Sequence, residues 1–167
     1  NDDNWPADQD NRMLIINSGL LSVSPGRAEG VLIGDNLRTM MLNAASVEFM
    51  PSLDKSVLFL EDDNESGDAM WSEFVSRLTS LTQRPDFSGV RGIVIGRFQK
   101  LKDADTRSGV TNQQIIDFFR ERPVFDRMPI IANANVGHTA PYSTRPIGGR
   151  VRIVSNPACS TIEILEH

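Results

Sequence analysis

His138 is the residue of this sequence best suited to proton transfer. It follows the apolar run 129–132 and lies on a loop that contains Gly137. Because imidazole changes its charge near neutral pH, a histidine on a loop at a strand end is well placed to act as a general base. The second histidine, His167, follows Leu-Glu at the end of the chain. We interpret residues 165–167 as the remnant of an affinity tag and exclude them from function.

Glu61 is the second candidate, since it directly follows the apolar run 57–60. In α/β folds, catalytic groups gather where the carboxyl ends of strands meet. A carboxylate at that edge can accept a hydrogen bond from the His138 ring and fix its tautomer. The alternative is that Glu61 only begins a solvated acidic turn over residues 61–65.

The sequence contains no serine in a Gly-x-Ser-x-Gly elbow, so a base and its carboxylate have no nucleophile to activate here. Cys159 lies in an expected hairpin turn without an adjacent base. We therefore expect part of the active site to lie on another chain segment. Residues 62–73 match a calcium-loop spacing, but a strand precedes them where a helix is needed. No side chains pair at metal-ligand spacing, and we predict neither a metal nor a cofactor.

Trp5 lies in a polar segment that contains a proline. An exposed indole there can stack on a planar ligand such as a nucleobase. The alternative is that the Trp5 ring folds back against its own domain.

The elements that must position these residues alternate between strand-like and helical runs, which is typical of a mixed α/β domain. We expect strands at 12–16, 27–33, 56–60, 90–96 and 129–132, helices from Asn36, over 66–81 and over 111–120, and a final hairpin of 150–154 and 160–164.

The bulk properties fit one domain of 167 residues with a net charge of −5. This charge argues against a nucleic acid polymer or an anionic membrane as the main partner. No run approaches the roughly twenty apolar residues of a membrane span. The single cysteine fits a reducing compartment, and we expect a cytoplasmic protein.

Several motifs that occur in a fixed order carry a resemblance to a known family. They are Glu29-Gly-Val-Leu-Ile-Gly-Asp-Asn-Leu37, Leu58-Phe-Leu-Glu-Asp62, Gly92-Ile-Val-Ile-Gly-Arg-Phe98, Gly137-His-Thr139 and Pro146-Ile-Gly-Gly149. The sequence resembles the C-terminal domain of the LD-carboxypeptidase family of serine peptidases, and more closely the branch that contains the microcin C immunity peptidase. One departure is Asp35, where the family has a second glycine. We expect it to alter the turn before the helix, since glycine tolerates positive φ better.

The resemblance implies a swivelling β/β/α-type fold with a mixed sheet and flanking helices. It also implies a Ser-Glu-His triad divided between two domains, with the serine on an N-terminal partner domain of the same protein. By motif match the other two members are Glu61 and His138, and Glu65 replaces Glu61 if the alignment slips. Trp5 resembles a tryptophan that holds the nucleotide part of the substrate. The full-length enzyme is expected to be a homodimer.

We therefore interpret residues 1–11 as an interdomain or substrate loop remnant, and residues 12–164 as the C-terminal domain of a serine carboxypeptidase. The preferred substrate is a peptidyl- or aminoacyl-nucleotide of the microcin C type. The alternative substrate is murein tetrapeptide, cleaved before its terminal D-alanine. A hypothesis of another class is a non-enzymatic binding domain with the same fold. The chain alone is predicted to be inactive because it lacks the serine.

Overall fold

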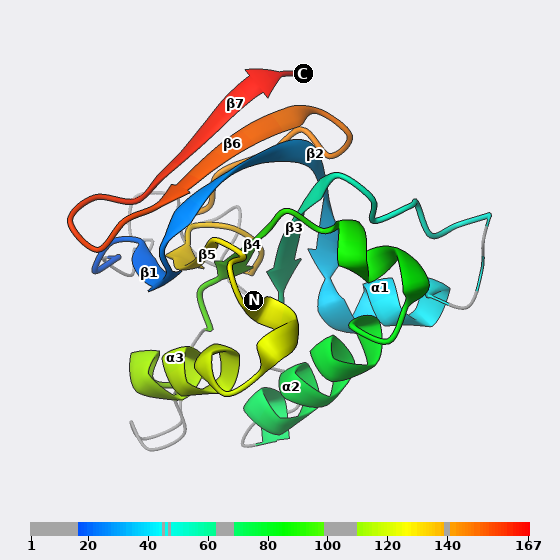
Figure 1. The fold of residues 1–167 in the computed structure, drawn as a ribbon, viewed down its shortest axis with the longest axis horizontal. Coiled ribbons are helices and arrows are strands. Elements are labelled where there is room, and N and C mark those ends of the chain that lie inside the picture. Colours follow the sequence, from blue (N-terminus) through cyan, green and yellow to red (C-terminus); the bar gives the residue numbers. More distant parts are fainter. Residues whose placement is uncertain (1–16, 45, 47, 63–68, 99–109, 139–140) are drawn as a thin grey trace, which may run out of the picture.

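The computed structural model describes residues 17–44, 46, 48–62, 69–98, 110–138 and 141–167. Within them, seven strands form one mixed sheet in the order β1-β5-β4-β3-β2-β6-β7 (Figure 1). The strands are β1 (Leu21–Ser24), β2 (Gly26–Asn36), β3 (Ser56–Glu61), β4 (Gly92–Gly96), β5 (Ile130–Ala134), β6 (Arg150–Ser155) and β7 (Thr161–Glu166). The helices are α1 (Leu37–Asn43), α2 (Met70–Leu81) and α3 (Asn112–Arg120), with short 3-10 turns η3 (Pro85–Gly89) and η4 (Pro123–Phe125).

The four central strands, β2 to β5, run parallel to one another, so their carboxyl ends lie at the same edge of the sheet. Continuous apolar runs form the middle of this sheet because both of its faces are covered. All residues of β3 and β4 are buried. This common edge is where the chemistry expected from the sequence would have to be located.

β2 is long and changes its partner along its length. Its first half pairs antiparallel with β6, and its second half pairs parallel with β3. Val31 takes part in both ladders, opposite Arg150 and Ser56. The strand is strongly bent along its length and carries β6 and β7 away from the helices (Figure 1).

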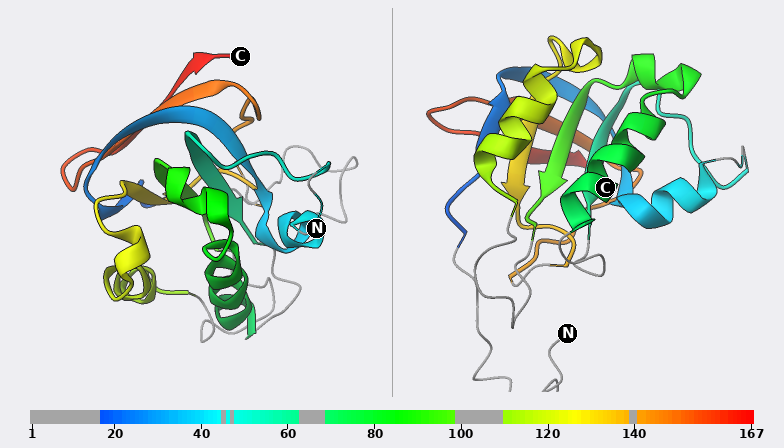
Figure 2. Two further views of the ribbon diagram at one scale, coloured as in Figure 1. Left: turned by 45° about the vertical axis from the view of Figure 1, so that its right-hand side comes forward. Right: turned by 90° about the horizontal axis from the view of Figure 1, so that it is seen from below.

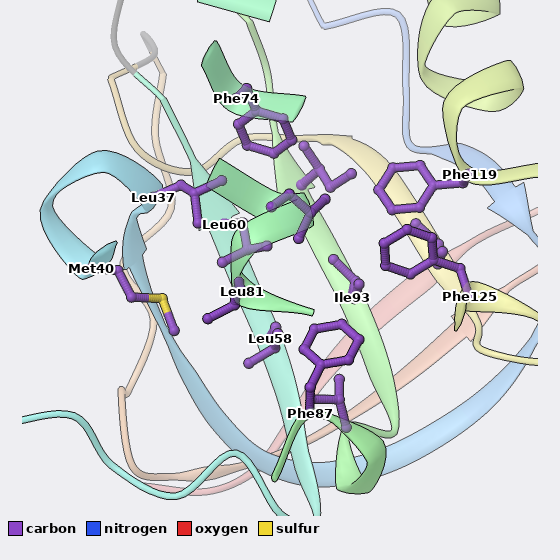
Figure 3. Packing of buried hydrophobic residues seen from close by; sticks show 14 of the residues in the cluster. Leu37, Met40, Leu58, Leu60, Phe74, Leu81, Phe87, Ile93, Phe119 and Phe125 are labelled. Carbon is purple, nitrogen blue, oxygen red and sulfur yellow. The ribbon is translucent and has the colours of Figure 1, made fainter. Parts of the chain in front are cut away.

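The helices cover one face of the sheet (Figures 1 and 2). Their apolar sides pack against β3, β4 and β5 in the larger core, which includes the residues drawn in Figure 3: Leu37, Met40, Leu58, Leu60, Phe74, Leu81, Phe87, Ile93, Phe119 and Phe125. Thr111 caps α3 in a reciprocal capping box with Gln114. Asn36 caps α1 by accepting a hydrogen bond from the Thr39 amide.

The opposite face of the central strands is covered by the curled sheet itself. A second core lies inside this curl and contains Ala28, Leu32, Val57, Phe59, Val94, Ile131, Ala134, Val136, Val151 and Ile153. The Ser155 hydroxyl donates to the Ile130 carbonyl at 2.9 Å and lies 2.8 Å from the Ser22 hydroxyl. These contacts join β1, β5 and β6. The layers of sheet, sheet and helix confirm the predicted α/β fold of the swivelling β/β/α type.

Most of the predicted elements are present, with three differences. The expected strand 12–16 lies outside the described residues. Helix α2 begins at Met70, and the part of its predicted start at 66–68 is also outside them. The edge strand β1 was not predicted, because its short serine-containing sequence lacks an extended apolar run. In the described part of the chain, no helix is long and apolar enough to cross a membrane.

Candidate active site

Glu61 and His138 meet at the carboxyl edge of the parallel strands. Glu61 is the last residue of β3, and His138 lies on the loop that follows β5. The Nδ1 atom of His138 is 2.8 Å from Oε2 of Glu61. The carboxylate side chain is only 6% exposed, whereas the imidazole is 58% exposed. The structure therefore brings together the two residues that the sequence paired.

The contact between these residues restricts the chemistry of the ring. A carboxylate oxygen accepts hydrogen bonds only, so a neutral imidazole in this contact carries its proton on Nδ1. Nε2 is then the ring nitrogen that can take a proton from another group. The backbone amide of His138 also donates to Oε2 of Glu61, at 3.3 Å. One carboxylate thus holds both the ring and the backbone of the histidine.

Two glycines make room for the Glu61 side chain. Gly137 has a φ of +79°, and a Cβ at this position would lie 2.3 Å from Oε2 of Glu61. A Cβ at Gly96, the last residue of β4, would lie 2.9 Å from Cβ of Glu61. Real Cβ atoms are not found at such short distances, so a larger residue at 137 would displace the carboxylate, and one at 96 would displace Glu61 or the Val136 carbonyl. This is the physical reason for the glycine before His138.

A sequence profile of the LD-carboxypeptidase C-terminal domain matches residues 29–153, which include both residues of this pair. The chain belongs to the LD-carboxypeptidase family. It is 40% identical to the putative carboxypeptidase YocD of Bacillus subtilis over 166 residues, which are 99% of this chain and 48% of that protein. It is 37% identical to a putative carboxypeptidase of Treponema pallidum, covering 98% of this chain and 45% of the relative. The chain thus spans about half the length of the curated relatives it matches.

Solved structures give the same result for the fold of this LD-carboxypeptidase domain. An MccF-like protein from Bacillus anthracis has a TM-score of 0.87 and 40% identity, over 99% of this chain and 48% of that chain. A muramoyltetrapeptide carboxypeptidase from Oxalobacter formigenes has a TM-score of 0.67 and 25% identity, over 86% of this chain and 48% of the other.

A second buried carboxylate of the LD-carboxypeptidase domain lies beside Glu61. Asp62 has a side chain only 3% exposed, and Nη1 of Arg77 lies 3.2 Å from its Oδ2. Arg77 belongs to α2 and also pairs with Glu73 one turn earlier. The arginine therefore neutralises a charge that burial would otherwise make costly. Sequence reasoning missed Arg77, although its spacing from Glu73 is that of a helical ion pair.

Asp62 and Glu73 were also members of the calcium-loop spacing that we disfavoured. Here both carboxylates contact one arginine. Among the residues that the structure describes, no group of three or more His, Cys, Asp or Glu side chains could hold a metal ion. Residues 63–68 of that loop lie outside this part of the chain.

Two arginines lie on the segments around His138. Arg97 follows β4, and its Nη2 donates to the Pro141 carbonyl at 3.4 Å. Arg145 is in the loop between His138 and β6 and is half-buried. Burial lowers the pKa of both guanidinium groups from its usual high value. An arginine stays charged at neutral pH even so, and Arg97 places positive charge beside the loop that carries His138.

The remaining predicted site residues have different outcomes. Trp5 and Glu65 lie outside the described residues, so their roles stay predictions. The expectation that Asp35 alters a turn is wrong, because Asp35 is part of β2 and does not have a positive φ. Its carboxylate accepts the Asn36 amide at 2.7 Å. The glycine that this strand needs is Gly34, where a Cβ would lie 1.7 Å from the Phe59 carbonyl oxygen.

Proposed function

We propose that this chain supplies the general base, His138, and its orienting carboxylate, Glu61, to a serine carboxypeptidase. The observation that carries the proposal is the 2.8 Å contact between a buried carboxylate and Nδ1 of an exposed imidazole. This arrangement gives the ring one defined tautomer and an accessible position, which are the two properties that a general base needs.

In the proposed reaction, Nε2 of His138 takes the proton of a serine hydroxyl while the serine oxygen attacks the scissile carbonyl carbon. Collapse of the tetrahedral intermediate breaks the amide bond, and His138 gives its proton to the leaving amine. A water molecule then hydrolyses the acyl-enzyme with the same base. Glu61 stabilises the imidazolium that forms in each half of the reaction.

The nucleophile is proposed to come from an N-terminal domain of the same protein. Two facts support this. The sequence has no serine elbow of its own, and the chain covers only 45–48% of its curated carboxypeptidase relatives. The full-length enzyme is proposed to be a cytoplasmic homodimer.

The preferred substrate is a peptidyl- or aminoacyl-nucleotide of the microcin C type. Support comes from Trp5 as a candidate for stacking on the base, and from the 40% identity to the MccF-like protein of Bacillus anthracis. The second candidate is murein tetrapeptide cleaved before its terminal D-alanine. It is favoured by the likeness to the muramoyltetrapeptide carboxypeptidase of Oxalobacter formigenes. A Trp5→Ala variant should lose turnover of the nucleotide substrate selectively, and unchanged turnover would favour the murein substrate.

A non-enzymatic binding domain is the hypothesis of another class. Such a domain has no need for a histidine held by a buried carboxylate. The deciding experiment measures hydrolysis by the full-length enzyme carrying His138→Ala, with the exposed Glu163→Gln as a matched surface control. We expect His138→Ala to abolish turnover without weakening substrate binding, and Glu163→Gln to behave as the wild type. Substantial hydrolysis by His138→Ala, or by the present chain alone, would show that the catalytic base is elsewhere.

A further inference from the structure

Asn17 connects the segment before β1 to the carboxyl end of β5, close to His138 in the sequence. Its side-chain amide donates to the Asn133 carbonyl oxygen at 2.9 Å and to Oδ1 of Asn135 at 2.6 Å. Its Oδ1 accepts a hydrogen bond from the Gly19 amide at 2.8 Å. Both amide hydrogens and the oxygen thus have partners, and the side chain is fixed in one orientation.

β5 is irregular where Asn17 binds it. Val94 of β4 pairs with Ile131, but Gly96 pairs with Ala134, so β5 has one extra residue over this stretch. Asn133 lies within the stretch and has a φ of 60°, a left-handed conformation that costs energy for residues with a Cβ and that asparagine tolerates better than most. Such bulges redirect a strand and are frequent beside active sites.

The irregular end of β5 leads into the loop that carries His138. The Asn135 carbonyl accepts a hydrogen bond from the Ser143 amide at 2.7 Å, which closes this loop. On its other side, Asn133 donates from its side chain to Oδ1 of Asn112, the first residue of α3, at 3.3 Å. Asn17 therefore contacts Asn133, which lies in the bulge, and Asn135, whose carbonyl closes the loop through Ser143.

We propose that Asn17 is a positioning residue for His138. Its amide holds the bulged end of β5, and with it the closed loop, in the position where the imidazole meets Glu61. This inference rests on the proposed function of His138 as the base. Because Asn17 acts through Asn133 and Asn135, its loss changes the placement of the base and should reduce kcat with KM unchanged.

The first test uses nuclear magnetic resonance of the His138 ring in the present chain, with His167 as an internal reference. The Asn17→Asp variant keeps the oxygen that accepts the Gly19 amide and removes both donors to β5. A flip of the Asn135 amide can restore one contact, but the Asn133 carbonyl stays without its donor. We expect the His138 Nδ1 proton to exchange with water roughly tenfold faster, because its partner is less well held. The exposed neighbour variant Ser18→Ala should match the wild type.

The second test measures kinetics in the full-length enzyme. Asn17→Asp should lower kcat roughly tenfold at constant KM, since small displacements of a catalytic group are costly. The exposed neighbour variant Ser18→Ala is the control here too and should retain the wild-type kcat. Asn17→Ala serves as the second variant and should give the same loss of kcat as Asn17→Asp.

An unchanged His138 signal and kcat in both Asn17 variants would overturn the positioning role and leave the proposed function intact. If Glu61→Gln itself leaves the His138 ring signals unchanged, the Glu61–His138 pair is not formed. That result would contradict the proposed function itself, independently of the role of Asn17.

Discussion

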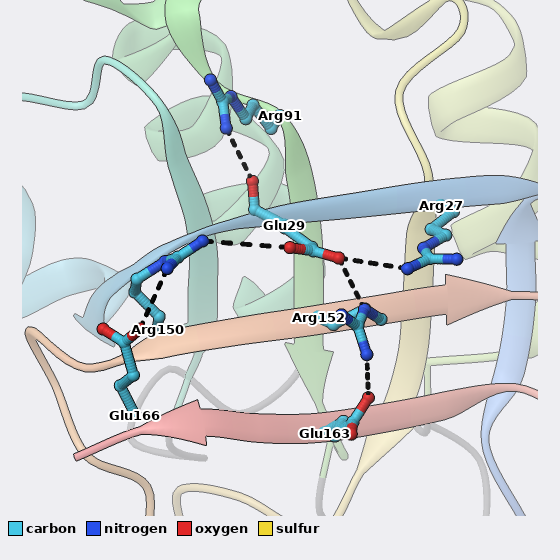
Figure 4. Close-up of polar contacts among 7 residues, drawn as sticks. All are labelled: Arg27, Glu29, Arg91, Arg150, Arg152, Glu163 and Glu166. Atoms are coloured by element: carbon cyan, nitrogen blue, oxygen red, sulfur yellow. Dashed lines mark hydrogen bonds and ion pairs between the residues drawn. The ribbon is translucent and has the colours of Figure 1, made fainter.

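Two glutamates of this domain, Glu61 and Glu29, differ in their burial and in the number of side chains that they bind. Glu61 lies at the end of β3, is buried, and contacts one histidine between two glycines. Glu29 lies on β2 and faces the outside of the sheet (Figure 4). Its carboxylate is 2.6 Å from Arg152, 3.1 Å from Arg27 and 3.9 Å from Arg150.

The Glu29 network continues across three strands. Arg152 also pairs with Glu163, and Arg150 with Glu166, so that β2, β6 and β7 are joined by charges (Figure 4). Arg91 adds a hydrogen bond to the Glu29 carbonyl oxygen. If one arginine is lost, the Glu29 carboxylate still has two others, whereas both contacts of Glu61 in the described part of the chain come from one residue, His138. The exposed network is redundant, and the buried pair is not.

The largest effect should follow from Glu61→Gln, which conserves the shape of the side chain and removes its charge. An amide at this position can hold the imidazole in the wrong tautomer and cannot stabilise the imidazolium. We expect kcat in the full-length enzyme to fall by about 10³- to 10⁴-fold, the size seen when the carboxylate of a serine protease triad is replaced by its amide. Glu29→Gln is the matched control and should leave kcat unchanged. Equal kcat values for the two variants would remove the functional distinction between the glutamates.

The next effect concerns stability at the buried edge. Arg77→Leu leaves the Asp62 carboxylate buried without this guanidinium, and removal of one partner of a buried pair costs about 3 kcal/mol of unfolding free energy. Urea denaturation of the chain provides the measurement. The double variant Asp62→Leu/Arg77→Leu should recover part of the loss, because neither member of this pair is then left as an unpaired buried charge. A double variant less stable than Arg77→Leu alone would contradict this account.

Gly137→Ala tests the space around Glu61. The added methyl group has no room beside the carboxylate, and alanine is strained at a φ of +79°. We expect kcat to fall by about 10²-fold through displacement of His138. Gly148→Ala is the control, because Gly148 also has a positive φ of +89° but nothing lies within 4 Å of an added Cβ. If both variants lose the same activity, strain and not the crowding of Glu61 is the cause.

The smallest effect is expected at Glu29 and depends on pH and salt. Hydrogen bonds from Arg152 and then Arg27 hold the pKa of Glu29 below its usual value. A lowered pKa in the folded state means that the ionised carboxylate stabilises the fold above its usual pKa. This contribution is lost as the pH falls through the lowered value. Glu29→Gln should therefore be slightly less stable than the wild type at neutral pH and low salt. The difference should disappear in acid and shrink in high salt, and its persistence in acid would exclude this ionic origin.

The sequence was sufficient for the pairing of Glu61 with His138, because parallel strands place their carboxyl ends together whatever their order. It was not sufficient for contacts that depend on distant packing. Nothing near Glu61 in the chain indicates that Arg77 of α2 neutralises Asp62, or that Gly96 leaves space for the carboxylate.

The two remaining errors concern local backbone. Asp35 was expected to alter a turn because the family has a glycine at this position. In the structure Asp35 has a strand conformation, which does not require glycine. β1 has only four residues and is defined by its pairing with β5, which lies more than a hundred residues later in the chain. Such a strand has no sequence pattern of its own. Only its pairing with β5 in the folded sheet identifies it as a strand.

The contact between Ser22 and Ser155 has a consequence for behaviour in solution. Open strand edges are templates on which other chains can add strands and aggregate. At one edge of the sheet, β1 has only four residues, and the curl brings it to β6, where Ser22 meets Ser155. The other edge, β7, carries the exposed Glu163, and charged side chains oppose pairing with a second chain. The short β1 edge and the charged β7 edge thus oppose fibrillar self-association of the domain.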